Sequence, residues 1–137
     1  MAKNYVLIDS SVWISYLKNT ASLDFTFLEE LILRKECATC HAIISEVLAG
    51  RMDKTTRQLM ESGFSAMRGM DVDWSNSFYW SQMIKIADRA ITLNKSAAGV
   101  VDRMILVNAK NFEISIYTYD KALIDLALLL KIKTIQI

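Results

Sequence analysis

The chain contains two kinds of apolar pattern. Short continuous apolar runs are typical of strands buried on both faces of a sheet. They predict strands at residues 5–8, 36–39, 114–118 and 133–137, with a further short strand within 65–72. Longer segments carry apolar residues three or four positions apart, which is the spacing of a helix with one buried side. They predict helices covering residues 12–17, 23–35, 42–50, 53–63, 76–93, 100–110 and 123–130.

The alternation of these strands and helices predicts an α/β fold. Short strands separated by helices form a parallel sheet covered by helices on both faces, with right-handed crossovers. The chain has no proline, no glycine- or serine-rich linker, no internal repeat and no run of like charges. We therefore expect residues 1–137 to form one domain.

Composition narrows the range of functions. Hydrophobic residues make up 53% of the chain, so it is not a disordered protein. No apolar run approaches the ~18 residues that a membrane span requires, and no secretory signal is visible, so we expect a cytoplasmic protein with no membrane partner. The net charge is +1, from 16 basic and 15 acidic residues. Nucleic-acid binding would therefore depend on a local basic patch or on metal ions.

Four acidic residues are candidates for chemistry. Asp9 and Asp120 follow predicted strands, Asp102 lies in the first turn of an apolar helix, and Glu46 lies in a short helix. Each has a purely structural alternative: Asp9 and Asp120 as helix N-caps, Asp102 as an acid at the positive end of its helix, and Glu46 as a solvent-facing residue. The carboxyl ends of parallel strands meet at the edge of the sheet where ligands bind. A divalent cation such as Mg²⁺ or Mn²⁺ would stabilise several carboxylates there.

Cys37 and Cys40 stand in the sequence C-A-T-C-H, which ends at His41. This spacing matches c-type haem attachment, and C-x-x-C alone also occurs in redox pairs. A zinc site would need further ligands, and His41 is the only histidine. We favour the simplest interpretation, in which both cysteines are reduced and buried.

The ordered motifs of the chain resemble those of the PIN-domain ribonucleases, in particular the VapC-type toxins of type II toxin–antitoxin systems. The resemblance extends over essentially the whole chain. The matching segments are I-D-S-S-V-W-I at 8–14, I-S-E-V-L-A-G at 44–50, V-D-R-M-I at 101–105 and Y-T-Y-D-K at 117–121. They carry Asp9, Glu46, Asp102 and Asp120 in the family's order.

The resemblance implies a three-layer α/β/α sandwich with a central, mainly parallel sheet, and an Mg²⁺- or Mn²⁺-dependent endoribonuclease. Its implied catalytic and metal-binding residues are Asp9, Glu46, Asp102 and Asp120, with a metal-activated water as nucleophile. Ser10 and Thr118, beside these acids, are candidate hydrogen-bond partners. Arg51, Lys54 and Arg57 are candidate RNA-binding residues, or else an ordinary solvated helix surface.

The resemblance also implies partners. We expect an RNA substrate, either tRNA or a single-stranded loop, and a cognate antitoxin protein. The antitoxin would bind in a groove between the first two helices. A homodimer, forming a higher assembly with the antitoxin, is expected from the large apolar residues around Trp74 and Trp80. The alternatives are a non-catalytic PIN-like interaction module and a PIN nuclease of RNA processing outside a toxin–antitoxin pair.

Overall fold

The structure, a computed structural model, describes residues 4–93 and 99–135. Its centre is a five-stranded sheet in which every neighbouring pair of strands is parallel. The strands are β1 (Val6–Ile8), β2 (Cys37–Thr39), β3 (Arg68–Gly69), β4 (Ser115–Tyr117) and β5 (Thr134–Ile135). The predicted parallel α/β fold is confirmed.

The order of the strands is β3-β2-β1-β4-β5, so the first strand lies in the middle. The chain adds β2 and β3 on one side of β1 and then returns to add β4 and β5 on the other. The strand order therefore reverses between β1 and β4. In open α/β sheets, the carboxyl ends of the two strands at such a reversal form the usual ligand-binding crevice.

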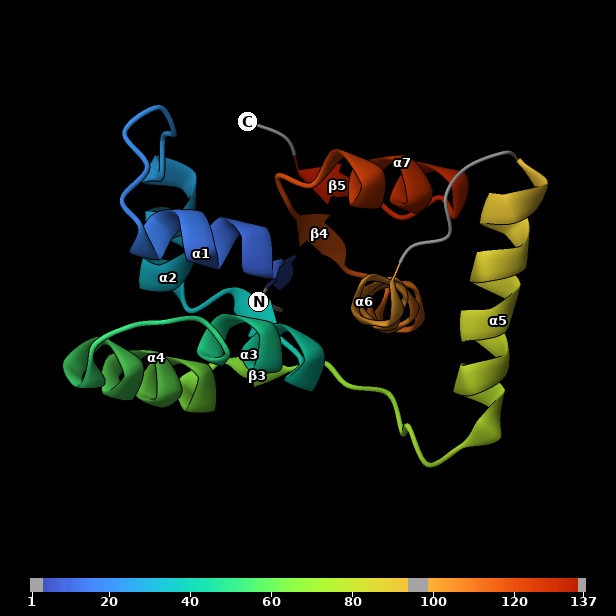
Figure 1. Ribbon diagram of the computed structural model, residues 1–137, viewed down its shortest axis with the longest axis horizontal. Coiled ribbons are helices and arrows are strands. Elements are labelled where there is room, and N and C mark those ends of the chain that lie inside the picture. The colour runs from blue at the N-terminus through green and yellow to red at the C-terminus, as the bar shows by residue number, and fades with distance from the viewer. Residues whose placement is uncertain (1–3, 94–98, 136–137) are drawn as a thin grey trace.

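Seven helices cover the sheet in the described part of the chain, completing a three-layer α/β/α sandwich (Figure 1). They are α1 (Ser10–Leu17), α2 (Thr26–Arg34), α3 (His41–Leu48), α4 (Lys54–Ala66), α5 (Ser77–Thr92), α6 (Val100–Phe112) and α7 (Lys121–Leu129). In Figure 1, α6 is seen end-on near the middle of the molecule and α5 stands along its outer side. None of the helices in residues 4–93 and 99–135 is long and apolar enough to cross a membrane.

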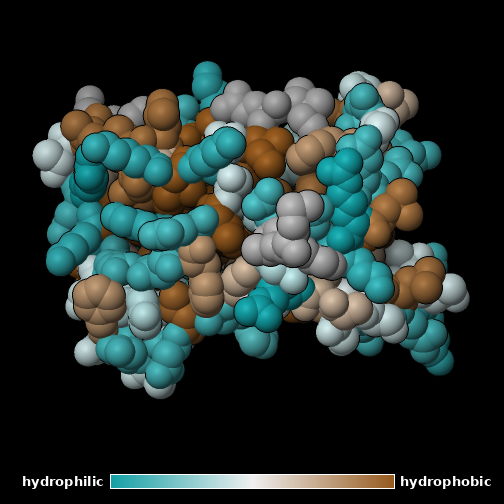
Figure 2. Space-filling model, turned by 180° about the vertical axis from the view of Figure 1, so that it is seen from behind, coloured by the Kyte–Doolittle hydropathy of each residue, from teal (hydrophilic) through white to brown (hydrophobic). Residues whose placement is uncertain are grey.

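The core is centred on β1 and α6. All three residues of β1 are buried, as its uninterrupted apolar run predicts. Five consecutive residues of α6, from Ile105 to Ala109, are buried too, which confirms that this helix is enclosed on most sides. Hydrophobic residues that the core does not enclose are visible among hydrophilic ones on the back of the molecule (Figure 2).

Several predicted details are wrong or incomplete. The helix expected to end at Gly63 continues to Ala66, because a single glycine costs a helix only about 1 kcal/mol and the buried Phe64 holds the last turn in place. Phe78 and Ile91 of α5 are exposed, although both belong to the apolar pattern that predicts the helix at 76–93. The last strand is Thr134–Ile135, and the end of the predicted segment 133–137 lies outside the described residues.

Candidate active site

Asp9 follows the central strand directly and is buried, with 3% of its surface exposed. It occupies the N-cap position of α1, yet its side chain accepts no hydrogen bond from the backbone of that helix. Its Oδ2 instead accepts hydrogen bonds from the hydroxyls of Ser11 and Thr118, both at 2.7 Å. Helix capping therefore does not explain this carboxylate. The two hydroxyls fix its orientation and leave Oδ1 available.

The second half of the site is the turn that follows β4. Thr118 is buried, and its Oγ1 accepts a hydrogen bond from the backbone N–H of Asp120 at 3.0 Å. The hydroxyl of Ser11 accepts one from the backbone N–H of Tyr119 at 3.1 Å and lies 3.2 Å from the Thr118 hydroxyl. These bonds join the start of α1 to the start of α7. Asp120 and Asp9 consequently lie at neighbouring strand ends, where the strand order reverses.

Asp120 is an N-cap as well as a candidate ligand. Its Oδ1 accepts hydrogen bonds from the backbone N–H groups of Ala122 at 2.9 Å and Leu123 at 3.4 Å. The capping alternative is therefore correct for this residue. The capping bonds involve Oδ1 alone, so capping does not exclude a second role for Oδ2.

Glu46 connects α3 to the same edge of the sheet. The residue is exposed, but its Oε1 accepts a 2.8 Å hydrogen bond from the hydroxyl of Ser10 in α1. Ser10 and Thr118 thus each donate a hydrogen bond to one of the four acids, as the sequence predicts. Ser11 also donates to Asp9 and is a functional residue that was not predicted from the sequence. Its position two residues after Asp9 was the available signal.

Asp102 lies within electrostatic range of the other three acids. It is half-buried in the first turn of α6. Burial, together with the negative charges of Asp120, Asp9 and Glu46, raises its pKa to about 6. These carboxylates come from α1, α3, α6 and α7, so the fold collects them from distant parts of the sequence.

The donor set suits a hard divalent cation, because carboxylate oxygens are the ligands that Mg²⁺ and Mn²⁺ prefer. The arrangement is not a finished metal centre. Across residues 4–93 and 99–135, no three His, Cys, Asp or Glu side chains form a group that could hold a metal ion as they stand. Metal binding by Asp9, Glu46, Asp102 and Asp120 therefore remains a prediction.

The predicted RNA-binding residues lie around the start of α4. Arg51 and Lys54 are exposed. The guanidinium of Arg57 donates to the backbone carbonyls of Leu48 at 2.7 Å and Gly50 at 3.1 Å, which satisfies the C-terminal end of α3. Arg57 thus has a structural role, and RNA contact by all three residues remains a prediction.

The two cysteines are free thiols, and both are buried. Burial raises the pKa of Cys37 and of Cys40 to about 11. Reactive thiols in redox pairs have a lowered pKa instead. The structure therefore favours the interpretation of two reduced core cysteines.

Asp71 is the centre of a further hydrogen-bond network, which the motifs of the sequence do not indicate. Its carboxylate accepts hydrogen bonds from the indole of Trp74 at 3.2 Å, from the amide of Asn108 at 3.4 Å and from the backbone N–H of His41 at 2.9 Å. Asn108 is fully buried and also accepts from the backbone N–H of Val72. A polar residue inside an apolar helix was the available signal.

Sequence comparison gives relatives of one kind. No family model matches the chain. Over 70 residues, the chain is 29% identical to the VapC ribonuclease Mb1587 of Mycobacterium bovis and to the ribonuclease VapC11 of Mycobacterium tuberculosis. The aligned part is 50% of this chain and 52% of each relative, so the match spans about half the length of these curated relatives.

Solved structures match the whole fold. The TM-score is 0.71 for DNA-bound VapBC from Salmonella typhimurium, at 16% identity and with 98% of each chain covered. For VapBC-1 from nontypeable Haemophilus influenzae it is 0.68, at 11% identity, with 96% of this chain and 97% of the other covered. The fold is therefore the three-layer α/β/α sandwich that these VapBC structures share. The predicted resemblance to VapC-type toxins is confirmed at the level of the fold and of sequence similarity over half of the chain.

Proposed function

We propose that this chain is a metal-dependent endoribonuclease and the toxin of a type II toxin–antitoxin system. The observation that carries the proposal is the proximity of carboxylates from distant parts of the chain at the reversal point of the sheet, where burial and the charges of the other three acids raise the pKa of Asp102. A cluster of mutually repelling carboxylates destabilises a fold, so it points to a function. The VapC ribonucleases that resemble half of the chain support RNA as the substrate.

The four acids would hold Mg²⁺ or Mn²⁺, which when bound neutralises phosphate charge and lowers the pKa of a water molecule. Thr118 and Ser11 hold the Asp9 carboxylate in one orientation through Oδ2. Ser10 holds Glu46 toward α1 in the same way. Binding of the ion would bring these carboxylates closer together than they stand, starting from the orientations that the hydroxyls set.

RNA would bind in a single-stranded or loop region, tRNA included, because the backbone of an unpaired strand is accessible to a crevice. Arg51 and Lys54 are exposed and available for phosphate contacts. Their contribution would appear as a loss of RNA affinity with increasing salt.

The antitoxin is proposed because three of the solved structures that share this fold are VapBC structures, two of them with DNA bound. Trp13 and Leu28 are buried, so the predicted groove between the first two helices is not open at these positions. A cavity of about 530 Å³ lies instead on another side of α1, lined by Leu17, Val47 and Arg51 among others. A partner helix would bind there. Such a controlled toxin would act in the cytoplasm.

A homodimer is proposed from the outer side of α5. Trp80, Ile84 and Ile91 are all exposed, at 43%, 61% and 63%, and their spacing places them along one side of the helix. Apolar stripes of this kind are common at protein interfaces. Light scattering should give the mass of a dimer, and the variant Ile84→Glu should reduce it to that of a monomer. A wild-type monomer at micromolar concentration would contradict the dimer.

The enzymatic proposal is tested with purified protein and single-stranded RNA. Cleavage should require Mg²⁺ or Mn²⁺ and should stop in excess chelator. Asp9→Asn and Asp102→Asn should each abolish it, whereas Asp88→Asn, at an exposed position of α5, should not. Cleavage that persists in chelator or in Asp102→Asn would refute the mechanism. A wild-type protein that binds but never cleaves RNA would favour the non-catalytic module.

A further inference from the structure

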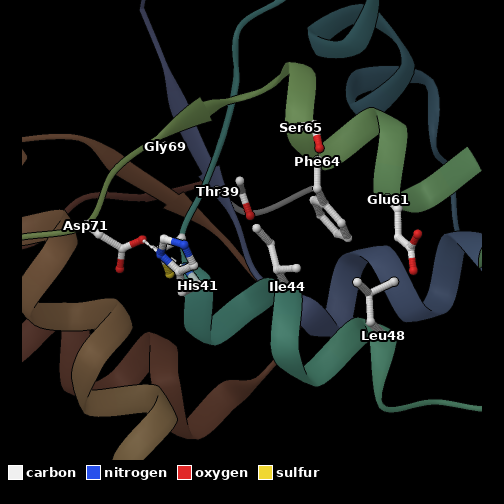
Figure 3. Close-up of a pocket in the computed structure, with 10 residues that line it drawn as sticks. Thr39, His41, Ile44, Leu48, Glu61, Phe64, Ser65, Gly69 and Asp71 are labelled. Carbon is white, nitrogen blue, oxygen red and sulfur yellow. Dashed lines mark hydrogen bonds and ion pairs between the residues drawn. The ribbon is translucent and has the colours of Figure 1, made fainter. Parts of the chain in front are cut away.

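A separate pocket lies on the other side of α3 from Glu46, between α3, α4 and the ends of β2 and β3. Its volume is about 370 Å³. Ile44 and Leu48 of α3 and Phe64 of α4 contribute apolar side chains, and Glu61 and Ser65 line it from α4 (Figure 3). Small-molecule sites are typically apolar cavities of this kind with a few well-placed polar groups.

The polar group that points to a ligand is Thr39, which lines the pocket beside Ile44, between His41 and Phe64 (Figure 3). It is 2% exposed, and its hydroxyl oxygen has no hydrogen-bond partner within the described part of the chain. An unpaired buried hydroxyl is unfavourable, and most such groups in proteins are satisfied. The comparable hydroxyls of Ser10 and Thr118 at the acid site are all bonded.

One end of the pocket is held by His41 and Asp71. The Nδ1 atom of His41 lies 2.6 Å from Oδ2 of Asp71, and the imidazole is 89% exposed. Trp74 and Asn108 donate to the other oxygen of Asp71. This end of the pocket is therefore fixed before any ligand binds. It contains His41, which belongs neither to the proposed metal site nor to the core.

The pocket and the acid site are separated by one helix. Ile44 and Leu48 line the pocket from α3, whereas Glu46 of the same helix is bonded to Ser10 at the acid site. An α-helix with its side chains is about 10–12 Å across. A strand of RNA that crosses α3 can thus place a phosphate at the acids and a nearby base at the pocket.

We propose that this pocket binds one unstacked base of the RNA substrate and gives the enzyme its sequence preference, an inference that rests on the proposed ribonuclease function. Unpaired bases are recognised by apolar or aromatic contacts with their faces and hydrogen bonds to their edges. Glu61 offers only acceptor oxygens, which pair with exocyclic amino groups. The pocket therefore prefers adenine, cytosine or guanine over uracil.

Nucleoside binding is tested first, without any cleavage. Methyl NMR of the metal-free protein follows Ile44 and Leu48 during separate titrations with the four nucleosides. Adenosine, cytidine or guanosine should shift these signals at lower concentration than uridine. Thr39→Val, which keeps the shape and removes the hydroxyl, should weaken binding about threefold to tenfold. Thr55→Val, at an exposed position of α4, should have no effect. Glu61→Gln should reduce the discrimination against uridine.

The proposal is overturned if no nucleoside shifts these methyl signals, or if Thr39→Val binds as the wild type does while its thermal melt shows an intact fold. Shifts that appear only with peptides of a partner protein would assign the pocket to protein binding and overturn it as well. Cleavage of RNAs that differ at one base then separates the two proposals. Thr39→Val should lose the preference but still cleave. Nucleoside binding by a wild-type protein that never cleaves RNA would leave the pocket standing and refute the proposed function.

Discussion

Replacing Asp102 with asparagine should stabilise the metal-free protein at neutral pH. The pKa of Asp102 is about 6 in the folded protein, above the ordinary value of 3.8, so the fold binds this proton more tightly than the unfolded chain does. The stability linked to the proton is fully present below about pH 4 and is lost as the pH rises through 6. Asparagine imitates the protonated side chain at every pH.

The size of the effect follows from the pKa. The difference between 3.8 and about 6 corresponds to about 3 kcal/mol, and because Asp102 is half-exposed we halve this to about 1.5 kcal/mol. Urea denaturation in chelator should therefore show Asp102→Asn about 1.5 kcal/mol more stable than wild type at pH 7.5 and equal to it at pH 4. Asp88→Asn serves as the exposed control. A variant that is equally or less stable at pH 7.5 would refute the proposed convergence of charges.

Two further predictions concern the groups around the acids. Thr118→Val removes the hydroxyl that donates to buried Asp9 and should destabilise the protein by about 2 kcal/mol in urea denaturation. Thr118→Ser should restore most of this, and an equal loss in both variants would contradict the role of the hydroxyl. Cys37 and Cys40, each with a pKa raised to about 11, should react slowly with a thiol reagent at pH 8 and rapidly after unfolding. Fast reaction of the folded protein would instead support a redox pair formed by Cys37 and Cys40.

The fold was predictable because the pattern of apolar and polar residues that identifies each strand and helix lies within that segment of the sequence. The apolar runs of the strands and the helical spacing of the amphipathic segments identify the order of elements, which is enough for a parallel α/β fold. Gly63 shows the limit of this reasoning, since packing of Phe64 outweighs the low helix propensity of a neighbouring glycine. The exposure of Ile91 likewise cannot be predicted from the helical spacing of apolar residues, because it depends on which other elements cover the helix.

The site was predictable only in part. The positions of Asp9 and Asp120 at strand ends follow from the sequence, since the carboxyl ends of parallel strands share one edge. The contact of Ser11 with Thr118 does not, because it depends on the pairing of β1 with β4. The unpaired hydroxyl of Thr39 is also invisible in sequence, where this residue is one of several in a short strand.

The most direct test of the central claim is a titration with Mn²⁺ observed by carbon-detected NMR of the side-chain carboxylates. If the four acids hold one metal site, a small amount of Mn²⁺ should selectively broaden the signals of Asp9, Glu46, Asp102 and Asp120. The signal of Asp88, exposed on α5, should stay sharp. The broadening should weaken as the pH falls below 6, because protons compete for the carboxylates. Equal broadening of Asp88 and the four acids, or none at all, would contradict the account.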